Sequence, residues 1–89
     1  MGFNDGLKSL AELPVRSFAY VVTVGGQGLT RRRLLDLGFV PGTLIEVIRS
    51  GPCGDPVAYG VRGTTVALRR EAAGEIQVKA AGKGWPGWA

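Results

Sequence analysis

The chain contains no histidine and a single cysteine, Cys53. Without histidine, catalysis by a Cys–His or Ser–His pair is excluded, and one cysteine alone is a poor start for a zinc site. A single cysteine cannot form an internal disulfide, which fits a reducing cytosol. No stretch approaches the ~20 apolar residues of a membrane span, and no N-terminal run resembles a signal peptide. We therefore expect a cytoplasmic protein without a cofactor or a metal.

The acidic residues show no pattern of a catalytic or metal site. Asp55 and Glu46 could form a carboxylate pair, but nothing in their spacing requires it. A hard cation could use several carboxylates, which lack the spacing of an EF-hand loop: Asp5, Asp36, Asp55, Glu71 and Glu75. Because no acid–base constellation stands out, we expect a protein that is not an enzyme.

Positive charge exceeds negative charge, with 11 basic against 7 acidic residues among 89 and a net charge of +4. This balance favours an acidic partner, which could be nucleic acid, an anionic membrane surface or an acidic protein patch. The strongest basic feature is the run Arg31-Arg32-Arg33, and Arg69-Arg70 adds a second cluster. The two clusters form one patch if the fold brings them to the same side.

Short runs rich in Val, Ile, Tyr and Thr, separated by turn residues, predict five strands, at 16–24, 43–50, 57–61, 64–68 and 76–80. Alternation along the second of these runs places Ile45 and Val47 inward, with Leu44 and Ile48 on the other face. One domain of this length with such strands favours a mainly β fold, a small SH3-like five-stranded barrel. The predicted core includes Leu37, Ile45, Val47, Val66, Leu68, Ile76 and Val78.

Helical segments are predicted to be few and short. Ser9 to Glu12 fits a capping box, and 70–75 reads as a helical turn. A short helix over 29–37 would begin at Thr30 as N-cap and end at Gly38 in the left-handed C′ position. The arginine run would then occupy its first turn, against the helix dipole. Pro41-Gly42 is a strong turn signal.

The predicted organisation is a flexible N-terminus over 1–8, a barrel over 9–80 and a flexible tail over 81–89. The tail carries both tryptophans, Trp85 and Trp88, among glycines. Aromatic side chains of this kind are common binding anchors. A binding role and a dispensable extension both remain open for this tail.

A series of motifs runs in order along the barrel: Arg33 through Gly42, then Pro52 through Pro56, then Arg62-Gly63, then Ala67-Leu68-Arg69. In this order and spacing the chain resembles the FeoA family, small cytoplasmic proteins encoded beside the ferrous iron transporter FeoB. The resemblance implies an SH3-type barrel with a helix after the first strand, in agreement with the strand pattern. It also implies an accessory protein that assists or regulates FeoB, whose cytosolic portion carries a GTPase. FeoA-like domains also occur fused to iron-dependent repressors, but this chain is too short for a DNA-reading helix-turn-helix, so we expect the standalone form.

The leading hypothesis is thus a non-enzymatic accessory of ferrous iron uptake, recruited to FeoB at the inner face of the inner membrane. We predict that its partner surface includes Arg31, Arg32, Arg33 and Phe39. The alternative is a basic SH3-like nucleic-acid-binding module, which the arginine run and the tryptophans would suit. The sequence leaves open whether the protein activates, inhibits or scaffolds the transporter, and whether it is a monomer or a homo-oligomer.

Overall fold

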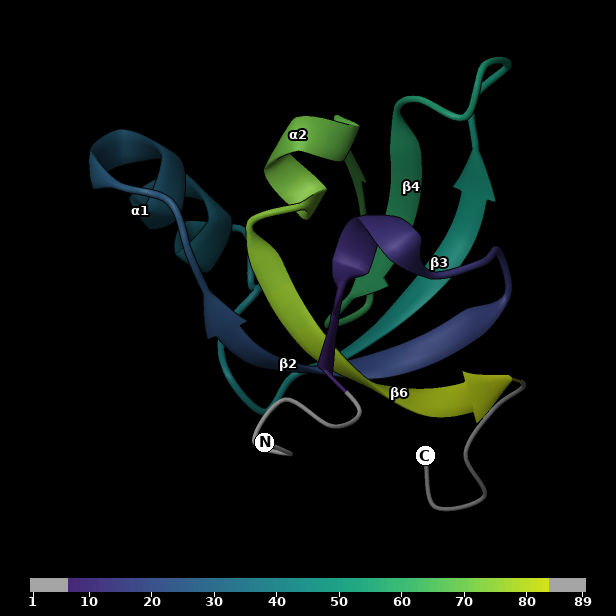
Figure 1. The fold of residues 1–89 in the computed structure, drawn as a ribbon, viewed down its shortest axis with the longest axis horizontal. Coiled ribbons are helices and arrows are strands. Elements are labelled where there is room, and N and C mark those ends of the chain that lie inside the picture. The colour runs from purple at the N-terminus through teal and green to yellow at the C-terminus, as the bar shows by residue number, and fades with distance from the viewer. Residues whose placement is uncertain (1–6, 84–89) are drawn as a thin grey trace.

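The computed structural model describes residues 7–83, which form a curved antiparallel sheet with short helical segments (Figure 1). The elements, in chain order, are β1 (Leu7–Ser9), the 3₁₀ turn η1 (Leu10–Glu12), β2 (Ser17–Val24), α1 (Gly28–Asp36), β3 (Leu44–Ser50), β4 (Val57–Val61), β5 (Thr64–Leu68), α2 (Arg70–Ala73) and β6 (Ile76–Lys83). No helix within this part of the chain is long and apolar enough to cross a bilayer.

The sheet has six strands in the order β1-β6-β2-β3-β4-β5, so the last strand lies between the first two. The mainly β prediction is confirmed, whereas the predicted number of five strands is wrong. The additional strand, β1, has three residues and pairs with β6 through Lys8 and Val78. Strand pairing therefore begins before residue 9 and continues beyond 80, because β6 extends to Lys83.

One contiguous core fills the concave side of the sheet. Ile45 and Val47 are 0% and 1% exposed, which confirms the predicted register of β3. Most of the predicted core is buried as expected, and Val66 is only half-buried against it. Leu37 is the exception: it is 38% exposed, because α1 ends at Asp36 and presents Leu34 rather than Leu37 to the core.

The helical ends match the sequence in part. Ser9 and Glu12 form the predicted capping box on η1, with the Ser9 Oγ accepting from the Ala11 N–H at 3.1 Å. Thr30 is not the N-cap of α1, which begins at Gly28 after Gln27, a residue whose side chain makes no capping bond. The helix thus starts earlier than predicted, and Arg33 lies in its last turn, where the dipole favours a cation.

Candidate functional site

The end of α1 is fixed by a Schellman motif, which positions the candidate site. The N–H of Phe39 donates to the carbonyl of Leu34 at 3.1 Å, and the N–H of Gly38 donates to that of Leu35 at 3.0 Å. Gly38 has φ +112°, as the sequence predicts for the C′ residue. This reversal sends the chain from the exposed helix directly into the barrel.

Phe39 enters the core as a consequence, with 0% of its surface exposed. Its ring meets Tyr59 edge to face, with centroids 6.3 Å apart and planes at 87°. The prediction that Phe39 contributes to a partner surface is therefore wrong. Its aromatic side chain instead anchors the loop after α1, which holds the helix against the barrel.

The three arginines of α1 are all exposed, but they have different surroundings. Arg31 donates from Nε to the carbonyl of Val24 at 3.1 Å, which ties the helix to the end of β2. Arg33 is two residues further along α1 and therefore lies on the opposite side of the helix from Arg31. There it lines a groove, whereas Arg32 does not line this groove. The predicted run thus divides into a structural contact, a solvated residue and a groove residue.

The groove lies between α1 and β5–α2 and encloses about 420 Å³. We call it the α1–β5 groove; it is lined by Thr30, Arg33, Leu34, Leu37, Val66, Ala67, Leu68, Arg69 and Ala72. Its floor is apolar, with Leu34 and Leu68 almost fully buried, while the Leu37 side chain is 38% exposed at the edge. In Figure 1 α1 and α2 lie on the same side of the barrel. Residues of both helices line the groove.

Two cations, Arg33 and Arg69, line the groove beside this apolar floor. They come from the two basic clusters of the sequence. The fold therefore brings the clusters together at this groove. Arg69 is paired with Asp55 at 3.7 Å, with 71% of the Arg69 side chain exposed. An exposed pair of this length contributes little to folding, so the Arg69 guanidinium is available to an acidic ligand.

Asp55 has a structural position rather than a catalytic one. Its Oδ1 accepts from the N–H of Arg70 at 3.0 Å, which caps the first turn of α2 from outside the helix. Within residues 7–83 no three carboxylates or thiols gather into a group that could hold a metal ion. Cys53 is a free, exposed thiol in the loop before β4.

Comparisons with known proteins agree with this architecture. Residues 8–80 match the FeoA domain family. A curated relative from Porphyromonas gingivalis, an Fe(2+) transport protein A/Fe(2+) transporter FeoB fusion protein, is 43% identical over 70 residues. That alignment covers 79% of this chain but only 8% of the fusion protein, so this chain corresponds to a small part of its relative.

Solved structures of FeoA proteins have the same fold. The FeoA protein of Chlorobium tepidum is 36% identical with a TM-score of 0.79, covering 91% of this chain and 83% of its own. The FeoA of Stenotrophomonas maltophilia, an SH3 domain protein solved with zinc, is 34% identical with a TM-score of 0.73, covering 81% and 89%. The six-stranded sheet is thus an SH3-like domain, and with its family match over residues 8–80 the chain belongs to the FeoA family.

Proposed function

We propose that this protein is a non-enzymatic cytoplasmic accessory of ferrous iron uptake that binds a FeoB-like transporter and regulates it. The observation that carries the proposal is the fusion relative, in which a FeoA domain and FeoB belong to one polypeptide. Two domains joined in one chain are held at high effective concentration. Their separate counterparts are expected to associate through surfaces that suit each other.

We assign the α1–β5 groove as the surface that receives the transporter. Its apolar floor suits one or two aliphatic or aromatic side chains, and its Arg33 and Arg69 rim suits flanking carboxylates. The expected occupant is a short acidic and apolar segment of the cytosolic part of FeoB. Of the predicted partner residues, the proposed surface keeps Arg33 and leaves out Phe39, which is buried. It adds Leu37, which lines the groove.

The electrostatic part is tested by titrating the cytosolic portion of FeoB, in each nucleotide state, with two matched charge reversals. Arg33→Glu with Arg69→Glu changes the groove, whereas Arg32→Glu with Arg49→Glu applies the same charge change at exposed positions outside it. We expect the groove variant to bind about tenfold more weakly or worse, mainly through slower association, and the control to bind within about threefold of the parent protein.

The apolar part is tested with two exposed leucines of the same helical region. Leu37 lines the groove and is 38% exposed, whereas Leu29 is 86% exposed and lies outside it. We expect Leu37→Ser to weaken binding and Leu29→Ser to leave it unchanged, with both variants folded. Equal effects of the two substitutions would place the partner elsewhere, and no association with either the cytosolic portion or the full-length transporter would remove the proposed function.

A further inference from the structure

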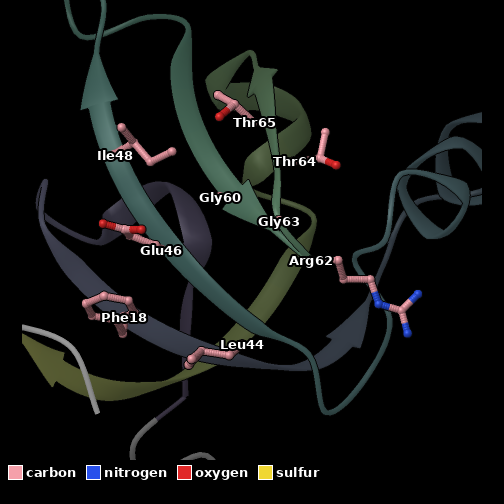
Figure 2. Close-up of a pocket in the computed structure, with 9 residues that line it drawn as sticks. All are labelled: Phe18, Leu44, Glu46, Ile48, Gly60, Arg62, Gly63, Thr64 and Thr65. Atoms are coloured by element: carbon pink, nitrogen blue, oxygen red, sulfur yellow. The ribbon is translucent and has the colours of Figure 1, made fainter. Parts of the chain in front are cut away.

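β5 is an edge strand of the sheet. Its residues, Thr64–Leu68, pair with β4, and within residues 7–83 no strand pairs with its other edge. Figure 2 shows the start of β5 beside a pocket on the outer face of the sheet, with β4 on one side of it and α1 on the other. The end of α1 lies close to this point, because a Cβ at Gly38 would be 3.5 Å from the Arg62 Cδ. The unpaired edge of β5 therefore lies on the side of α1.

The α1–β5 groove follows this unpaired edge. Three consecutive residues of β5 line the groove, Val66, Ala67 and Leu68. Because successive side chains of a strand point to opposite faces, a groove that touches three residues in a row runs along an edge of the strand rather than over one face. β4 occupies the other edge at the same residues, where Ala58 pairs with Ala67. The groove and the unpaired edge are therefore in the same place.

The turn before β5 determines which backbone groups point toward the groove. Arg62 and Gly63 both have positive φ, +53° and +81°, as in a type I′ turn, whose flanking residues form a hydrogen-bonded pair. Bonded and non-bonded pairs then alternate along an antiparallel ladder. Alternate residues of β5, starting at Thr64, thus bond toward β4, whereas Thr65 and Ala67 direct their N–H and C=O groups outward. Within the described part of the chain, nothing bonds to these outward groups.

The edge lacks the features by which natural edge strands usually avoid further pairing. Such strands are very short, carry charged residues or proline, or contain a bulge. β1, at the opposite end of the sheet, has three residues with Lys8 in the middle. β5 has five residues, Thr-Thr-Val-Ala-Leu, and pairs without a register shift. It carries neither a charge nor a proline, so its edge can accept a further strand.

Positive charge at both ends of β5 decides which kind of strand fits. Arg62 precedes the strand, Arg69 and Arg70 follow it, and all three are exposed. Arg33 of α1 adds a fourth charge in the groove, and Asp55, 3.7 Å from Arg69, offsets one of the four. A second copy of β5 would place arginines beside arginines in either orientation, which is unfavourable. A strand with acidic residues at both ends and uncharged residues between them is complementary.

We propose that the partner segment binds as a further β-strand, added to the free edge of β5 within the α1–β5 groove. This inference rests on the proposed function and names the form in which the transporter segment binds. The segment is extended over about eight residues, since the strand rise from Arg62 to Arg69 amounts to about 23 Å. It carries Asp or Glu near both ends and apolar side chains toward the groove floor. Its backbone bonds to Thr65 and Ala67, and its side chains provide specificity.

Hydrogen exchange of the parent protein tests this mode of binding. In the free protein the amides of Thr65 and Ala67 should exchange at least tenfold faster than that of Val66, whose N–H points toward β4. Saturation with the cytosolic portion of FeoB should slow exchange at Thr65 and Ala67 about tenfold or more, because both amides become hydrogen-bonded. The amide of Val66, already bonded in the free protein, should change much less.

A proline substitution tests the same bonds by removing one of them. Ala67→Pro deletes an outward N–H, at a position of an edge strand that tolerates proline. Ala67→Ser is the matched control, because it changes the same exposed side chain and keeps the N–H. We expect Ala67→Pro to bind the cytosolic portion of FeoB about tenfold more weakly or worse, and Ala67→Ser to bind within about twofold of the parent protein.

The outcomes separate this inference from the proposed function. FeoB that binds while Thr65 and Ala67 exchange as in the free protein would overturn the strand addition alone, and so would folded Ala67→Pro and Ala67→Ser variants of equal affinity. If Ala67→Pro does not fold, the exchange of the parent protein decides. Protection of the two amides that grows with protein concentration, without FeoB, would identify a second copy as the occupant and overturn the inference. No association with FeoB in any form would remove the proposed function and the inference together.

Discussion

Tyr59 is a buried residue whose phenol has a different pKa in the folded protein than in the unfolded chain. It is 1% exposed, and burial raises the pKa of its phenol to about 12, with a smaller opposing effect of Arg70 and a further increase from Asp55. In the unfolded chain the pKa is about 10. Below pH 10 the phenol is neutral in both states and has no effect. Between about pH 10 and 12 only the unfolded state loses the proton, so stability falls as the pH rises.

We expect this single group to remove about 3 kcal/mol of stability by about pH 12. The measurement is urea unfolding near neutral pH and at about pH 11 for the parent protein and for Tyr59→Phe, which keeps the ring. Other groups titrate in this range in both proteins, so the difference between them isolates Tyr59. Tyr59→Phe should gain stability relative to the parent as the pH rises. Parallel pH profiles would show that folding does not change the pKa of the phenol.

Phe39 shows what residue-scale reading of the sequence missed. Gly38 was correctly predicted as the C′ residue of the helix, and its φ of +112° agrees. In a Schellman motif the following residue packs back on the last turn, which is a local signal that an apolar Phe39 would be buried. For Leu37 the prediction was wrong in the opposite direction. Its spacing from Leu34 predicts a buried position on the same helix face, but Leu37 is the C-cap of α1 and is exposed. When the predicted end of a helix is wrong by one residue, a residue predicted to be buried can be exposed, and the reverse.

At the scale of elements, the turns around α1 and β3 depend on two glycines that differ in surroundings. Both have positive φ, +112° at Gly38 and +93° at Gly42. A Cβ at Gly38 would lie 2.8 Å from the Val61 Cγ1, whereas a Cβ at Gly42 meets nothing within 4 Å. Gly42→Ala should therefore cost about 1 kcal/mol from the backbone alone. Gly38→Ala should cost about 2–4 kcal/mol, since overpacking adds to the same strain.

Urea unfolding of the two variants measures this difference, with equal m-values as the check that both remain two-state. Equal losses of stability would show that Val61 yields without cost. An unchanged Gly42→Ala variant would contradict the left-handed conformation of the turn.

Some elements can be predicted from the local sequence pattern, and others form only because of contacts with distant parts of the chain. β3 and β4 have buried residues at alternate positions, and the two-residue turn Arg62-Gly63 joins β4 to β5, so local pattern suffices to predict them. β1 has three residues, too few for a period, and exists because β6 offers a free edge to Leu7–Ser9. The meeting of the two arginine clusters is predicted only as a condition, because no local pattern says that Arg33 and Arg69 lie on the same side of the barrel. The α1–β5 groove itself is not predicted from the sequence.

At the scale of the whole molecule, the strand order β1-β6-β2-β3-β4-β5 has two parts. In one part the paired strands are consecutive in the sequence, and in the other they are far apart in the sequence. β3, β4 and β5 are consecutive antiparallel neighbours with short connections. β6, in contrast, joins two strands from the other end of the chain, pairing Val78 with both Lys8 and Val21. Closing such a long loop costs entropy before its contacts form. We therefore expect the β3–β4–β5 meander to form first and β6 to insert after it.

Two buried valines provide a matched test of the order in which these strands fold. Val61 in β4 is 1% exposed and Val78 in β6 is 0% exposed, so truncation of either to alanine should destabilise the fold by about 2 kcal/mol. Stopped-flow folding and unfolding in urea then separates the two. Val61→Ala should mainly slow folding, with a φ-value of about 0.5 or higher, whereas Val78→Ala should mainly speed unfolding, with a φ-value below about 0.3. The reverse ranking would mean that the fold nucleates on the long-range β2–β6 pairing, with the meander added last.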